Sequence, residues 1–171
     1  MNRILVTGGL GYIGSHTVVV LQEAGFLVTI IDDLSNTNLK VLDNISTITG
    51  KKPSFYEIDL KDKSKVDAFF ETEKIDGIIH FAAFKAVGES VEKPLAYYRN
   101  NIVGLLNVLD AMEQYQLDHF IFSSSCTVYG QADQMPINEN TPLKRPESPY
   151  GKTKAMGEEI ISDFTKASNK N

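Results

Sequence analysis

The sequence has little of several features that mark particular classes of protein. Its 171 residues include a single cysteine, Cys126, so no disulfide can form within the chain. A lone thiol is typical of a reducing compartment, and we expect a cytoplasmic protein. The three histidines, His16, His80 and His119, do not have the spacing of metal ligands, so we expect no metal site.

Charge and hydrophobicity exclude two further classes. A net charge of -5 gives no basic surface of the kind that binds nucleic acid. The sequence contains no run of 18 apolar residues and no basic-then-apolar leader, so we expect neither a membrane span nor a signal segment. With 42% hydrophobic and 23% charged residues, the chain has the composition of an ordinary soluble domain that can bury a core.

Short apolar runs alternate with longer helical patterns along the chain. Strands are expected at 3–7, 27–32, 54–59, 77–83 and 119–124, and helices at about 11–24, 63–72, 94–115 and 150–167, with a weaker helical pattern that ends near residue 48. Apolar side chains at helical spacing are expected to face the sheet: Phe69, Phe70, Leu105, Leu106 and Leu109. Four prolines make the segment 130–149 a loop. The alternation predicts an α/β fold with a doubly wound parallel sheet, Rossmann-like and three-layered (α/β/α), and we interpret 1–171 as one dinucleotide-binding domain.

A glycine-rich segment, residues 8–14, follows the first expected strand and opens the first helix. Gly8 permits a tight turn, Gly11 lets the backbone approach a pyrophosphate, and Gly14 lets helix and strand pack closely. Asp32 ends the second strand, where a carboxylate can bond ribose hydroxyls and would repel a 2′-phosphate. The pattern predicts a site for NAD rather than NADP. The alternative is a glycine-rich turn that binds no ligand.

Tyr150 and Lys154 begin the last expected helix, directly after the proline-containing loop. Side chains four residues apart share a helix face, and an ammonium group beside a phenol favours the ionised phenol, which is a base. The hydroxyl residues 123–125 end the preceding strand, where they can converge on the same cleft. These parts suit removal of a proton from an alcohol whose carbon gives hydride to NAD. An ordinary amphipathic helix can carry the same pair.

Five motifs resemble those of the short-chain dehydrogenase/reductase superfamily. The resemblance is to its extended branch, which modifies nucleotide sugars, and within that branch to the UDP-hexose 4-epimerases. The motifs are VTGGLGYIGSHT at 6–17, HFAAFKAVGES at 80–90, YYRNN at 97–101, FSSSCTVYG at 122–130 and SPYGKTK at 148–154. The resemblance implies an isomerase that interconverts UDP-glucose and UDP-galactose at C4 through a 4-keto sugar, with NAD regenerated in each cycle.

The resemblance also implies a role for each matching residue. Tyr150 would remove the proton of the sugar 4-hydroxyl, and Ser125 would hydrogen-bond the same hydroxyl. Lys154 would bond the nicotinamide ribose and favour the ionised form of Tyr150. Contacts with NAD are implied for Gly8, Gly11, Gly14, Tyr12 and Ile13 at the pyrophosphate, Asp32 at the adenosine ribose, Asp59 and Leu60 at the adenine, and Phe81, Ala82, Ala83, Lys85 and Asn100 on the cofactor's other side. Phe84 stands where the family usually has Leu and could crowd the pocket.

Members of this family run well beyond this length. We therefore expect an N-terminal part that stops before the last strands and the substrate domain, and whose fifth strand is an exposed sheet edge. Two other functions remain open, an inactive NAD-binding fragment and a related nucleotide-sugar epimerase or dehydratase. Dehydratases typically carry Asp-Glu where this sequence has Cys126 and Thr127, which disfavours elimination. By analogy, a homodimer could form through the helices expected at 94–115 and 150–167.

Overall fold

The computed structural model describes residues 2–168, which divide into two compact units. Residues 2–82 and 106–123 form the first unit, and residues 83–105 and 124–168 form the second. The single domain expected over 1–171 stays a prediction, and its end residues 1 and 169–171 lie outside the described part of the chain.

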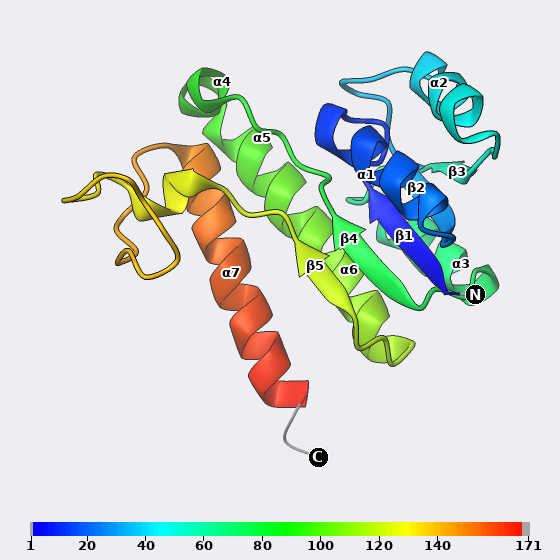
Figure 1. The fold of residues 1–171 in the computed structure, drawn as a ribbon. Helices are drawn as coiled ribbons and strands as arrows, with labels where there is room; N and C mark the ends of the chain where they lie inside the picture. Colours follow the sequence, from blue (N-terminus) through cyan, green and yellow to red (C-terminus); the bar gives the residue numbers. More distant parts are fainter. Residues whose placement is uncertain (1, 169–171) are drawn as a thin grey trace. The chain divides into compact units, whose positions relative to one another are not determined.

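The first unit is built on a five-stranded parallel sheet (Figure 1). Its strands are β1 (Arg3–Thr7), β2 (Leu27–Asp32), β3 (Ser54–Glu57), β4 (Gly77–His80) and β5 (Phe120–Phe122). They lie in the order β3-β2-β1-β4-β5, so the direction of winding reverses between β1 and β4. The expected parallel α/β fold is confirmed, although β3, β4 and β5 end earlier than the sequence predicts.

Helices of the first unit cover the sheet on opposite faces. On one face, α1 (Tyr12–Glu23) and α2 (Lys40–Thr49) pack on alternate residues of β1 and β2, with Val6, Val18, Ile30 and Leu42 in one buried cluster. On the other face, the ring of Phe69 from α3 (Lys63–Thr72) lies 5.0 Å from that of Tyr56 in β3. The alternation along each strand is what lets one sheet bury apolar side chains on both sides.

Strand β5 is the edge of the sheet formed by the described residues, as expected. Phe120 and Phe122 point to the face that carries the His80 ring, with ring centroids 6.0 and 6.1 Å from it. Ile121 therefore points to the opposite face, where it is 61% exposed.

The second unit is mostly helical. Its helix α7 (Pro149–Ser168) packs against α4 (Val87–Glu92), α5 (Pro94–Tyr98), the π-helical turn η1 (Arg99–Val103) and the 3₁₀ turn η2 (Cys126–Tyr129). Residues 130–148, all of them described, contain neither helix nor strand, which confirms the predicted loop. Neither α4 nor η2 is expected from the sequence.

The long helix expected at 94–115 is interrupted. The turn η1 separates α5 from α6 (Gly104–Gln114), so the prediction of one uniform helix is wrong in detail. Leu106 is also wrong as a core residue, because it is 42% exposed. The other four predicted core residues are buried, at positions 69, 70, 105 and 109.

Between residues 2 and 168, no helix combines the length and the apolar character needed to cross a bilayer.

Candidate functional site

The glycine turn after β1 is packed too tightly for side chains. Gly8 has φ +68°, and a Cβ placed there would lie 2.7 Å from the backbone nitrogen of Ala82. A Cβ on Gly14 would overlap the carbonyl oxygen of Gly8. Gly8 also donates its N–H to the carbonyl of Ile31 in β2 at 2.8 Å. The turn is therefore held against both neighbouring strands, and Gly8 and Ala82, both predicted cofactor residues, lie together.

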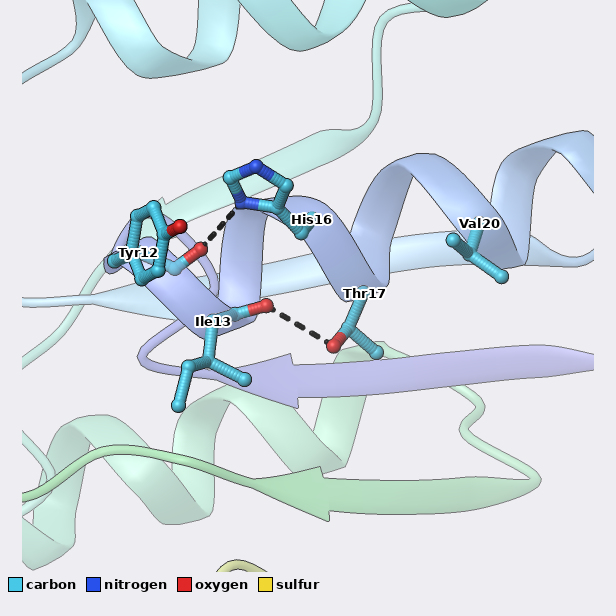
Figure 2. A pocket seen from close by; sticks show the side chains of 5 residues that line it. All are labelled: Tyr12, Ile13, His16, Thr17 and Val20. Carbon is cyan, nitrogen blue, oxygen red and sulfur yellow. Dashed lines mark hydrogen bonds between the residues drawn. The ribbon is translucent and has the colours of Figure 1, made fainter.

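The amino terminus of α1 is open to a ligand. Gly11 is its N-cap and makes no side-chain capping bond, and the first turn has no acidic residue. The first N–H groups of a helix have no partner within the helix and, with the helix dipole, favour an anion. Tyr12 and Ile13 begin this turn with exposed side chains (Figure 2). These features are the ones a pyrophosphate requires.

An open pocket follows the exposed side of α1 beyond this turn. It is lined by Tyr12, Ile13, His16, Thr17 and Val20 (Figure 2). His16 donates from Nδ1 to the Tyr12 carbonyl at 2.7 Å, and its ring lies edge-on to the Tyr12 ring at 4.9 Å. The pairing holds the Tyr12 ring beside the helix start.

Asp32 lies at the end of β2 and is 8% exposed. One carboxylate oxygen accepts the N–H of Leu10 and the other accepts the N–H of Leu34, each at 3.1 Å. Burial raises the pKa of the Asp32 carboxyl, while these hydrogen bonds act to lower it. Asp32 thus joins the glycine turn to the segment after β2. The sequence predicts only a contact between Asp32 and ribose, and not this structural role.

The residues after β3 have other partners. The Asp59 carboxylate accepts the N–H of Lys61 at 2.9 Å and forms an ion pair with its ammonium at 3.0 Å. Leu60 is buried, and its carbonyl accepts the Asn107 side chain of α6 at 2.7 Å. Both residues therefore lie in a fixed turn of the first unit.

The second unit contains a buried amide that sequence reasoning missed. Asn101 in η1 accepts the N–H of Phe84 at 2.8 Å and donates to the Phe84 carbonyl at 2.9 Å and to Thr153 in α7 at 3.0 Å. Asn100, a predicted cofactor residue, donates to the Asn101 side chain at 3.1 Å. The network fixes the backbone between Ala83 and Lys85. The YYRNN motif contains Asn101, but nothing in the motif shows which of its two asparagines is buried.

Phe84 also has an aromatic partner in the second unit. Its ring lies edge-on to that of the buried Tyr97, with centroids 5.6 Å apart. The Tyr97 hydroxyl donates to Glu89 at 2.9 Å and accepts the N–H of Ala86 at 3.1 Å. Phe84 therefore packs on a tyrosine that is itself anchored.

The first two turns of α7 carry Tyr150 and Lys154. Ser148 is buried and its hydroxyl accepts the N–H of Gly151 at 3.1 Å, so Ser148 caps a helix whose first residue is Pro149. Tyr150 is half-buried. Lys154, one turn later, is 4% exposed, and burial lowers the pKa of its ammonium to about 8. The shared helix face of Tyr150 and Lys154 is the predicted arrangement, whereas the burial of Lys154 is not predicted from the sequence.

Ser125 caps the turn η2. Its hydroxyl accepts the N–H of Thr127 at 3.3 Å and the Thr127 hydroxyl at 3.0 Å. The hydroxyl of the neighbouring Ser124 donates to the Glu158 carboxylate of α7. Cys126 is exposed. Across residues 2–168, no group of three or more His, Cys, Asp or Glu side chains is placed to hold a metal ion.

The sheet order and the glycine turn define a Rossmann-like α/β fold. The chain belongs to the GDP-mannose 4,6 dehydratase family, whose sequence profile matches residues 5–170. It is 49% identical over 166 residues to the UDP-glucose 4-epimerase of Bacillus subtilis, covering 97% of this chain and 49% of the relative. The chain thus spans about half the length of the curated relatives it matches.

Two solved structures of UDP-glucose 4-epimerases are also similar to this chain. The UDP-glucose 4-epimerase of Bifidobacterium longum, in complex with NAD+ and UDP, superposes with a TM-score of 0.95 at 40% identity, over 97% of this chain and 50% of that one. The UDP-glucose 4-epimerase of Stenotrophomonas maltophila, with bound NAD and formylated UDP-arabinopyranose, gives 0.93 at 40% identity, over 98% and 50%.

Proposed function

We propose that this chain supplies the NAD-binding and catalytic part of an enzyme that interconverts UDP-glucose and UDP-galactose by epimerisation at C4. The observation that carries the proposal is the first turn of α7, where a Ser148 cap holds the half-buried Tyr150 one turn before the buried Lys154. The epimerases of B. subtilis and B. longum are similar to nearly all of this chain, and this similarity supports the proposed epimerase function.

The residues of the first unit fit NAD. The open amino terminus of α1 offers N–H groups to a pyrophosphate, and the missing side chains at Gly8 and Gly14 let the backbone approach closely. The two Asp32 oxygens each accept one backbone N–H, and a carboxylate has further lone pairs for ribose hydroxyls. Asp33 adds a second carboxylate beside Asp32, so a 2′-phosphate is repelled and NAD is favoured over NADP.

The roles proposed for the second unit follow from its chemistry. Bound NAD would supply the hydride chemistry at sugar C4, which comprises acceptance of the C4 hydride and its return to the opposite face of the 4-keto sugar. Tyr150 accepts the proton of the 4-hydroxyl and gives it back when the hydroxyl re-forms. Lys154, with a pKa of about 8, carries its charge near neutral pH and bonds the nicotinamide ribose. Ser125 hydrogen-bonds the same sugar oxygen.

Elimination of water is the nearest competing reaction, since the family is named for a dehydratase. It needs an acid/base pair beside the hydroxyl residue. At the two positions after Ser125 the chain has Cys126, which is exposed, and Thr127, whose hydroxyl bonds Ser125. Neither is a carboxyl group, so epimerisation is the reaction we propose.

A cytoplasmic location and a homodimer through α5, α6 and α7 are further proposals.

A graft tests the function directly. The test protein is a chimera, called the graft below. In it, the present chain replaces the matching 166-residue segment of the B. subtilis relative. We expect it to convert UDP-galactose to UDP-glucose, measured by coupling the product to a UDP-glucose dehydrogenase. Tyr150→Phe is expected to lower kcat about 10²–10⁴-fold, the range of general acid–base catalysis. The matched control is Tyr115→Phe, which removes an exposed hydroxyl from the first unit. A folded graft that binds NAD but is inactive with Tyr150 intact contradicts the proposal.

A further inference from the structure

We propose that Thr127 is a positioning residue that makes Ser125 a dedicated hydrogen-bond donor to the sugar 4-oxygen. The inference rests on the proposed function. Thr127 is half-buried in η2, two residues after Ser125, and neither the motifs nor the spacing of the sequence assign it a role.

The hydrogen bonds at Ser125 decide the direction in which its proton points. A serine hydroxyl has one proton and two lone pairs. Thr127 donates to the Ser125 oxygen twice, from its backbone N–H at 3.3 Å and from its hydroxyl at 3.0 Å. With both lone pairs occupied, the Ser125 hydroxyl can still donate but has little capacity left to accept.

A donor is what the reaction requires at this oxygen. As a 4-hydroxyl, the sugar oxygen gives its own proton to Tyr150. As the 4-keto oxygen it has no proton and can only accept a hydrogen bond. A Ser125 held as a donor stabilises the developing carbonyl and alkoxide, whereas a freely rotating serine would lose part of that stabilisation to the wrong orientation.

Thr127 also contacts the turn that carries Tyr150. A Cβ on Gly151 would lie 3.1 Å from the Thr127 hydroxyl oxygen, 3.2 Å from its Cβ and 2.9 Å from the Cβ of Pro146. The backbone directly after Tyr150 therefore packs against Thr127 with no room for a side chain. The same residue that orients Ser125 lies against the start of α7, so it fixes the separation of the two segments.

Two substitutions in the graft separate this role from general packing. Thr127→Val keeps the branched shape and removes the hydroxyl, while Thr127→Ser keeps the hydroxyl and removes a methyl group. We expect Thr127→Val to lower kcat about 10-fold with KM and NAD affinity unchanged, below the 10²–10³-fold cost of removing an oxyanion donor itself. Thr127→Ser is expected to retain most of the activity.

A double-mutant cycle gives the readout that a merely structural role would not move. In a Ser125→Ala background the Thr127 hydroxyl has nothing to orient, so Thr127→Val should cause no further loss of kcat. An equal loss in both backgrounds, or no loss in either, overturns the assignment. If the parent graft and Thr127→Ser are both inactive while folded and loaded with NAD, the proposed function itself fails, and this assignment falls with it.

Discussion

The carboxylate of Asp32 and the backbone N–H of Leu10 form a 3.1 Å hydrogen bond that ties the end of β2 to the glycine turn. A second bond from the Leu34 N–H to the other oxygen leaves the carboxylate fixed on both sides. Asp32 therefore shapes the glycine turn in addition to its proposed contact with ribose.

Replacing Asp32 should weaken NAD binding through both effects. We expect Asp32→Ala to raise the Kd for NAD at least about 10-fold, because hydrogen bonds to charged groups contribute about 1.5–3 kcal/mol. The preference for NAD over NADP should narrow. Titration calorimetry with both dinucleotides measures this. Asp33→Ala is the control: the Asp33 carboxylate accepts the N–H and the hydroxyl of the nearby Ser35, so its loss should change NAD affinity less. An equal rise in the Kd for NAD with the two substitutions would contradict the assignment.

Gly14 should not tolerate a methyl group. The added Cβ of Gly14→Ala overlaps the Gly8 carbonyl, which belongs to the turn itself and cannot move aside. We expect a loss of about 3 kcal/mol or more in the free energy of unfolding, at the upper end of overpacking costs. Gly88→Ala in α4 is the control, because its Cβ meets no atom within 4 Å and alanine is the better helix former. Chemical denaturation measures the free energy of unfolding of the two variants. Similar values would show that the glycine turn has room for a methyl group at Gly14.

Lys154 should make stability depend on pH. Its ordinary pKa of 10.5 falls to about 8 in the fold because burial disfavours the charged form. Between these values the unfolded chain binds more protons, so stability rises with pH, by on the order of 3 kcal/mol over the whole window. Lys154→Met should be more stable than the wild type at pH 7, and the difference should shrink toward pH 10. A difference that stays constant across this range would rule out burial of the charge as its cause.

Asn101 should contribute more to stability than its neighbour. Asn101→Ala removes the partners of the Phe84 N–H and carbonyl, and unsatisfied buried groups cost about 1–3 kcal/mol each. Asn100→Ala removes the hydrogen bond that the half-buried Asn100 donates to Asn101, leaves the contacts of Asn101 with Phe84 in place, and serves as the comparison. Thermal unfolding monitored by circular dichroism should show the larger loss for Asn101→Ala, and the reverse order would contradict the proposed anchoring.

The sequence predicts the parts of this fold that depend on local pattern. Apolar runs ended by Gly8 and Asp32 identify strands because buried parallel strands are continuously hydrophobic. Leu106 is expected to face the sheet together with Leu105 and Leu109, but it lies off the buried side of α6. Leu105, Val108, Leu109 and Met112 form the buried stripe at helical spacing, and Leu106 lies about 100° away from Leu105 around the helix.

Features that depend on distant partners could not be predicted. The π-helical turn η1 is fixed by packing, and Asn101 within it bonds Thr153, which lies 52 positions further along the chain. The sequence marks Thr127 only as a position where dehydratases typically carry an acidic residue, and its contact with Ser125 depends on the backbone of η2. Tyr150 and Lys154 could be singled out because both lie on one helix face.

The most direct test of the account follows the hydrogen on C4 of the substrate. The graft is supplied with UDP-galactose deuterated at C4, and the UDP-glucose formed is analysed by NMR and mass spectrometry. The account predicts full retention of deuterium at C4, because the hydride removed with NAD returns to the same carbon without meeting solvent. Loss of the label to water, or uptake of solvent hydrogen at C4, would show that the stereocentre is inverted by proton exchange and would contradict the proposed function.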